Sequence, residues 1–175
     1  MGNNPSRFSS IHRPVEQVSY LDCKEFIEKL NTQSKSNYRL PSNAEWIFAA
    51  KGMNQKEENF PGSPNAKEVA NYVSNSNKMS NCNGLKLPNE LGIFDMCGNV
   101  SEWCEITSTK YENSNLQLKT FSFFSESPEL FTLKEQLIRG GSWEESSEFI
   151  VLSNRYFEGM DKKFDDIGFR LARSI

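Results

Sequence analysis

The chain has 175 residues, 37% of them hydrophobic and 12% aromatic, which suits one domain with one apolar core. Its formal net charge of −3 gives no basis for nucleic-acid binding, and no apolar run is long enough to cross a bilayer. The sequence shows no secretory signal pattern, so a cytoplasmic location without membrane partners is the default expectation.

The cysteine and histidine content argues against a zinc site, because His12 is the one histidine and no Cys-x-x-Cys pair is present. The cysteines are Cys23, Cys82, Cys97 and Cys104. For Cys97 and Cys104, two small buried thiols in a reducing compartment are the favoured interpretation. A disulfide between them is the alternative.

Two helices are predicted in the first third of the chain. Residues 20–30 place apolar side chains at spacings of three and four, which gives one buried face. Before them, residues 14–20 look extended. The second helix follows Ser42, which forms a capping-box pattern with Glu45, and it ends at Gly52.

Two irregular stretches follow, residues 53–87 and residues 106–135. The first is long for a loop in a compact domain, so it is either functional or held by a metal or by its own side chains. Within the second, residues 121–124 are rich in phenylalanine and predict a strand. The chain closes with residues 167–173, whose alternation of apolar side chains predicts a further strand.

Residues 89–105 and residues 137–143 interleave tryptophans, glycines and single polar residues. Glycine permits backbone conformations that other residues avoid, and each tryptophan brings a large buried area with one N–H that needs a partner. A loop-rich core held by side chains is therefore predicted. For Trp46, Trp103 and Trp143, core packing is favoured over an aromatic binding platform.

Seven segments in this order resemble the formylglycine-generating enzyme family, also called the sulfatase-modifying factor domain. They are residues 4–8, 14–19, 38–46, 88–96, 98–103, 139–143 and 167–171, and they include Gly98-Asn99-Val100-Ser101-Glu102-Trp103, Arg139-Gly140-Gly141-Ser142-Trp143 and Ile167-Gly168-Phe169-Arg170-Leu171. The resemblance implies a single α+β domain over residues 1–175, a C-type-lectin-like variant with two helices, short antiparallel strands and much irregular chain. The family domain begins with a further segment that carries the first strands, so an N-terminally shortened domain or a fragment is implied.

Active members of that family oxidise a cysteine of a sulfatase to formylglycine, using oxygen and a Cu(I) ion held by two cysteines. Those cysteines follow the Gly-Gly-Ser-aromatic motif, and the matching positions here are Glu145 and Ile150. Cu(I) requires soft thiolate ligands, and no cysteine follows Cys104. Copper is therefore not expected, and no catalytic residue is assigned.

Family members also bind calcium, and one of their sites matches Asp95, Gly98, Val100 and Glu102. Two carboxylates and two backbone carbonyls form a ligand set that Ca²⁺ accepts. The alternative is that both carboxylates cap turns in an empty loop. A weaker second site would use Asn71 and Tyr72, but the carboxylate that it needs near Gly84 is missing.

Residues 144–166 match the part of the family that holds the substrate groove, and in some lectin-fold relatives this part is a diversified ligand-binding surface. Here it is acidic and aromatic, which suits a protein or peptide ligand. The candidate binding residues are Glu144, Glu145, Glu148, Tyr156 and Phe157, and Glu158 and Asp161 add to the acidic character. The alternative is a solvated acidic loop. The arginines Arg139, Arg155 and Arg170 are expected to pair with loop carboxylates, with binding of an anionic partner as the alternative.

A non-catalytic binding module on a formylglycine-generating-enzyme scaffold is the favoured hypothesis. The first alternative is an oxidoreductase that matures sulfatases with non-standard residues. Family relatives that use iron need a histidine-rich partner domain, which His12 alone cannot replace. The second alternative is a truncated remnant, whose missing strands would expose unpaired backbone.

Overall fold

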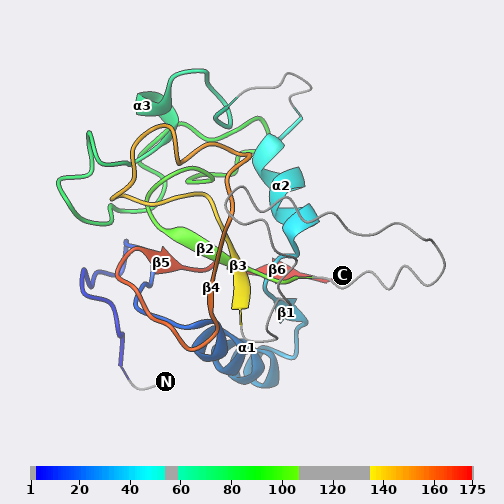
Figure 1. Ribbon diagram of the computed structural model, residues 1–175. Helices are drawn as coiled ribbons and strands as arrows, with labels where there is room; N and C mark the ends of the chain where they lie inside the picture. The colour runs from blue at the N-terminus through cyan, green and yellow to red at the C-terminus, as the bar shows by residue number, and fades with distance from the viewer. Residues whose placement is uncertain (1–2, 54–58, 107–134, 175) are drawn as a thin grey trace, which may run out of the picture.

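The computed structural model describes residues 3–53, 59–106 and 135–174, and it shows an α+β fold with three helices and six short strands in these ranges (Figure 1). The helices are α1 (Tyr20–Ser34), α2 (Asn43–Lys51) and α3 (Ala66–Val69). The strands are β1 (Tyr38–Arg39), β2 (Ser101–Cys104), β3 (Glu135–Arg139), β4 (Tyr156–Gly159), β5 (Ile167–Gly168) and β6 (Ala172–Arg173). In these ranges, none of the helices has the length and apolar character needed to cross a membrane.

The strands form two small sheets. The larger sheet has the order β4-β3-β2-β5, in which β2, β3 and β4 pair antiparallel. Its β2–β5 pair is parallel, which the expectation of antiparallel strands did not include. The smaller sheet pairs β1 with β6 and so joins the early chain to its C-terminal end. Figure 1 shows α1 beneath the sheets and α3 with its loops at the opposite end.

Helix α1 begins at a complete capping box between Ser19 and Asp22, and the buried side chains of Cys23 and Ile27 confirm the predicted inner face. The helix continues past its predicted end at residue 30 and stops at Lys35, whose φ of 52° is left-handed. Asn31 explains the extension, because its side chain donates to the carbonyl of Tyr38 at 2.8 Å and accepts from its N–H at 2.7 Å. One polar side chain therefore joins the last turn of α1 to β1.

Helix α2 has the predicted boundaries. Ser42 and Glu45 form the capping box, and Gly52 follows the last turn. Trp46 and Ala50 are buried and anchor this helix to the core, while Ala49 is partly buried against the same cluster. Local sequence signals and long-range packing agree here.

Other predictions need correction. Helix α3 lies in a stretch that was expected to be irregular, so the described residues contain three helices rather than two. In residues 14–20 only Glu16 pairs, through a single bridge to Gly168. Residues 167–173 form two strands in different sheets, and Leu171 is 38% exposed, so the predicted inward alternation is wrong at that position. The strand expected at residues 121–124 lies outside the described residues.

The core consists of three apolar clusters, and the three tryptophans are part of the buried interior. Trp46, Trp103 and Trp143 are 1%, 0% and 7% exposed, which confirms core packing over a binding platform. Each indole N–H is satisfied: Trp103 donates to the carbonyl of Val18 at 3.0 Å and Trp143 to that of Asp165 at 3.2 Å. Trp46 donates to a carboxylate that is described below.

Asparagine side chains hold much of the irregular chain. Asn89 donates to the carbonyls of Ala49 and Ala50 and accepts from the N–H groups of Leu91 and Ile93, so it links the end of α2 to the next loop. The Asn99 side chain bonds both the N–H and the carbonyl of Asn81. Within residues 53–87, the side chains of Asn75 and Asn81 also donate to the carbonyls of Ala70 and Ser76, so this part of the stretch is held partly by its own side chains, as one of the explanations predicted.

Candidate functional site

The predicted calcium ligands lie in the loop before β2 and on β2 itself. Asp95 has a φ of 55° and Gly98 a φ of 71°. A side chain at Gly98 would run into the carbonyl oxygen of Asn71, which pairs with this part of the loop, so only glycine fits. The loop thereby brings Asp95 and Glu102 to the wall of one cavity.

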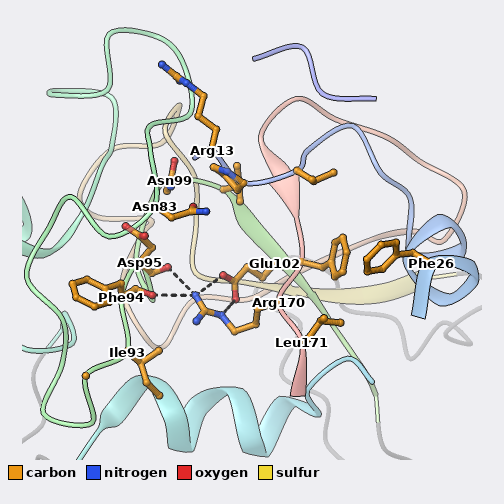
Figure 2. A pocket seen from close by; sticks show the side chains of 15 residues that line it. Arg13, Phe26, Asn83, Ile93, Phe94, Asp95, Asn99, Glu102, Arg170 and Leu171 are labelled. Atoms are coloured by element: carbon orange, nitrogen blue, oxygen red, sulfur yellow. Dashed lines mark hydrogen bonds and ion pairs between the residues drawn. The ribbon is translucent and has the colours of Figure 1, made fainter. Parts of the chain in front are cut away.

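Glu102 is buried, and its carboxylate is fully engaged by protein groups. Its Oε2 accepts from the indole N–H of Trp46 and from Nε of Arg170, both at 2.6 Å, and Oε1 accepts from Arg170 Nη2 at 2.6 Å. The same Nη2 donates to the carbonyls of Phe94 and Asp95 (Figure 2). A guanidinium therefore supplies the positive charge beside Glu102.

Asp95 is engaged through one oxygen. Its Oδ2 accepts from the N–H of Gly84 at 2.7 Å, while Oδ1 is buried with no partner among the described residues. Burial raises the pKa of this carboxyl, and the Gly84 N–H and the charge of Arg170 lower it. The residues present fit calcium only in part, because Glu102 is taken and the described residues hold no cluster of three or more acidic, cysteine or histidine side chains placed for a metal.

The residues of the weaker calcium prediction lie next to this loop. Asn71 pairs through its backbone with Gly98, and Tyr72 is buried with its N–H donating to the side chain of Asn75. Near Gly84 the structure places Asp95, whose Oδ2 accepts from the Gly84 N–H at 2.7 Å. That contact joins positions eleven apart in a loop, and no spacing rule would have found it.

The two positions that match the copper ligands of active family members lie together beneath Gly141. A Cβ built on Gly141 would meet Glu145 Oε2 at 2.5 Å and Ile150 Cγ2 at 2.7 Å, so only glycine, here with a φ of 68°, lets both side chains approach. Glu145 Oε2 accepts from the N–H of Ser142 at 3.1 Å. Ile150 is fully buried. The scaffold thus places the pair side by side, with a carboxylate and a hydrocarbon in place of two thiols.

All four cysteines are free, which confirms the reduced interpretation of Cys97 and Cys104. Cys23, Cys97 and Cys104 are buried in three different apolar clusters. Burial raises the pKa of all three thiols, that of Cys23 to about 12. They are therefore protonated at neutral pH and are not available as thiolate ligands.

The candidate binding residues extend from the loop after Gly141 to β4. Glu144 and Glu148 are exposed, and Tyr156 and Phe157 are each 37% exposed at the start of β4. Glu145 is less accessible and hydrogen-bonds Tyr156. Phe149, which the sequence reasoning omitted, is half exposed on the same loop. The structure therefore brings Glu145 and Tyr156 together, whereas Tyr156 and Phe157, as successive residues of a strand, point to opposite faces of the sheet.

Two side chains that the sequence analysis did not single out for this role hold the loop in place. Arg139 is buried at the end of β3 and donates from Nη1 to the carbonyls of three successive residues, Leu152, Ser153 and Asn154. Its Nε and Nη2 donate to Asn43 Oδ1 at 2.8 and 2.6 Å. The Asn154 side chain donates to the carbonyls of Glu148 and Phe149. Arg139 thus holds the loop by donating to backbone carbonyls and not by pairing with a carboxylate. The predicted pairing with a carboxylate is found at Arg170.

Stability should depend on pH through Glu145. Burial raises the pKa of Glu145, with the charges of Asp166 and Glu144 adding to the effect and the Ser142 N–H opposing it. A raised folded-state pKa favours folding fully below the unfolded value of 4.5, and that contribution is lost as the pH rises through the folded pKa. Glu145→Gln is therefore expected to gain stability relative to the parent protein from pH 4 to pH 7. Urea unfolding at each pH measures this difference, and a constant difference would contradict it.

Comparison with known proteins decides the family. The model of the family described as "Sulfatase-modifying factor enzyme 1-like domain" matches residues 2–175. The chain belongs to this family. Its fold is that of the formylglycine-generating enzymes, as the sequence motifs indicated.

Individual relatives of this sulfatase-modifying-factor-like chain agree. The structure titled "Treponema denticola variable protein 1" superposes with a TM-score of 0.78 and 26% identity over 99% of this chain and 78% of that one. "Chaperone protein LppX" of Paenibacillus barcinonensis is 33% identical over 59% of this chain and 55% of that protein. "Inactive C-alpha-formylglycine-generating enzyme 2" of Bos taurus is 23% identical over 91% of this chain and 50% of that protein. The chain spans about half the length of these two curated relatives.

Proposed function

We propose that the chain is a non-catalytic module of the sulfatase-modifying factor type, which binds a protein or peptide ligand through the surface formed by Glu144, Glu145, Glu148, Tyr156 and Phe157. The observation that carries the proposal is the pair beneath Gly141. Glu145 and Ile150 approach each other in the place that the family uses for two copper-binding cysteines. A hard carboxylate and a hydrocarbon do not hold Cu(I).

The remaining thiols do not substitute for that pair. The three buried cysteines belong to separate apolar clusters and have raised pKa values, so they form no shared thiolate site. The name of the bovine relative, which calls that protein inactive, is in keeping with a family member that has kept the fold without the oxidase chemistry.

The surface itself favours a basic partner. Burial raises the pKa of Glu145 and of Asp166, and the charge of Glu144 adds to the rise at both. A ligand that brings positive charge would relieve this repulsion. Tyr156 and Phe149 add aromatic area beside these carboxylates. Because Arg139 and Asn154 already fix the loop, little ordering is required when a ligand binds.

The catalytic half of the proposal is tested by incubating the protein with copper and a Cys-x-Pro-x-Arg peptide under air. We expect mass spectrometry to find no copper-dependent formylglycine, because no soft ligand pair is present. An active family member assayed in parallel controls for the peptide and the copper source. Copper-dependent formylglycine made by this chain would overturn the proposal.

The binding half is tested with a peptide of alternating lysine and tyrosine, titrated by calorimetry at low and physiological salt. Glu144→Lys combined with Glu148→Lys is expected to weaken binding by roughly tenfold or more. Glu28→Lys combined with Glu90→Lys changes the net charge equally at exposed positions elsewhere and should leave the affinity near that of the parent protein. Equal losses in both double variants would reject the surface.

Calcium binding at Asp95, Gly98, Val100 and Glu102 is a second proposal, favoured by the buried, unpartnered Oδ1 of Asp95. A calcium ion bound by Glu102 would have to displace the guanidinium of Arg170. Calcium titration of the parent protein and of Arg170→Gln tests this, and the variant should bind more tightly. Absence of binding in both proteins would reject the proposal.

A further inference from the structure

Two neighbouring cavities form one groove on the side of the molecule where α1 approaches β5. The first has a volume of about 650 Å³ and the second about 350 Å³. Both are lined by Val15, Phe26 and Phe169, so the two cavities adjoin at these side chains. Figure 2 shows the first cavity with polar side chains gathered at one end and Phe26 at the other.

At the polar end the charge of Arg170 is paired, whereas Arg13, which also lines this cavity, donates to the sulfur of Met79 and has no ion-pair partner among the described residues. Glu102 neutralises Arg170 through Nε and Nη2, and Nη1 has no partner among the described residues. The Arg170 side chain is 27% exposed, so this third nitrogen is within reach of a ligand. Asn83 is exposed in the wall of the same cavity, on the Asp95 side, and its amide makes no hydrogen bond to the described residues (Figure 2).

The rest of the groove is apolar. Phe26 and Phe169 meet edge to face with ring centroids 5.6 Å apart, and Val15 and Leu171 leave part of their side chains open to the groove. The second cavity continues this floor over Val18 and Cys23 towards Pro5. A chain-shaped apolar group would therefore find contacts along the whole length.

We propose that this groove binds an uncharged amphiphile, whose carbonyl or hydroxyl oxygen meets Arg170 and Asn83 while its aliphatic chain lies along Val15, Phe26 and Phe169. The side chains that line the cavity determine that the head group of the ligand is uncharged. Arg170 is already paired, Asp95 keeps its free oxygen buried, and the guanidinium of Arg13 points away from this pair (Figure 2). A charged head would lose hydration without gaining a counter-ion. The proposal is independent of the acidic surface described above.

The test uses butanamide, hexanamide and octanamide, with octanoate and octylammonium as charged analogues, titrated by calorimetry and by amide NMR shifts in EDTA. Affinity is expected to rise about threefold for each added methylene. The charged analogues should bind roughly tenfold more weakly than octanamide or worse. Octanamide that binds no better than butanamide, or no better than its charged analogues, would overturn the proposal, as would shift changes that lie outside the groove.

Variants locate the site. Val15→Trp and Leu171→Trp each fill the groove from a partly exposed position and are expected to reduce octanamide affinity at least tenfold, so either alone suffices if the other fails to fold. Leu87→Trp adds the same ring at an exposed position that lines neither cavity and should bind like the parent protein. In Asn83→Leu, the affinity for octanamide should exceed the affinity for an alkane without a head group by less than it does in the parent protein. Equal losses in Leu87→Trp and Val15→Trp would contradict the assignment.

Discussion

Replacing Glu102 with alanine is expected to lower the free energy of unfolding by about 3–5 kcal/mol, because it breaks a buried ion pair. The side chain is buried and accepts three hydrogen bonds of 2.6 Å. Its removal leaves the indole N–H of Trp46 without a partner and the guanidinium of Arg170 without a counter-ion. Urea denaturation at pH 7 measures the loss.

A matched control separates this effect from that of an ordinary ion pair. Glu105 pairs with Lys24 at 2.6 Å and hydrogen-bonds Tyr20, but the Glu105 and Lys24 side chains are partly exposed. Glu105→Ala should therefore cost about 1–2 kcal/mol, less than Glu102→Ala. The double variant Glu102→Met with Arg170→Met removes both charges and should recover part of the stability lost in Glu102→Ala. Similar losses for Glu102→Ala and Glu105→Ala would show that Glu102 does not organise this region.

Arg139→Met is the second large effect, expected to cost about 3 kcal/mol because hydrogen bonds to a buried charged group contribute more than neutral ones. The change removes every bond from the guanidinium to Asn43 and to the carbonyls of Leu152, Ser153 and Asn154. The loop between Glu144 and β4 should then open. Hydrogen exchange of its amides is expected to accelerate more than exchange in α1.

Arg155→Met serves as the control, since Arg155 is exposed two residues before Phe157 and carries the same charge. Its stability should stay within about 0.5 kcal/mol of the parent protein, and loop exchange should be unchanged. If Arg139→Met leaves the loop exchange rates as they are, the loop is held by other contacts and the pre-organised binding surface is not supported.

Local signals in the sequence were sufficient for part of this fold. The capping box at Ser42 and the glycine at position 52 define α2, because both act within one helical turn. The ordered motifs identified the family and its α+β architecture. The same motifs located Glu145 and Ile150, and the structure places both beneath Gly141.

Contacts between distant segments could not be predicted from local sequence patterns. Glu102 meets Trp46 and Arg170 across separations of 56 and 68 residues, and no local pattern encodes such a meeting. The parallel pairing of β5 with β2 likewise joins segments that are far apart in the sequence. Asparagines such as Asn89 appear as turn residues in a sequence, and only the structure shows which backbone groups they satisfy.

The proposed function rests on the pair of side chains beneath Gly141. Gly141 lets these two side chains approach, and the loop that carries them is fixed by Arg139. On this proposal a carboxylate and a hydrocarbon supply no soft ligand, and the carboxylate adds to the acidic surface.

Titration of the reduced protein with Cu(I) against a competing chelator tests this account most directly. The parent protein is expected to compete for no stoichiometric copper, because Glu145 and Ile150 supply no thiolate. Glu145→Cys combined with Ile150→Cys should gain one tight equivalent, since Gly141 already lets both side chains meet. One tightly bound equivalent of Cu(I) in the parent protein would contradict the account.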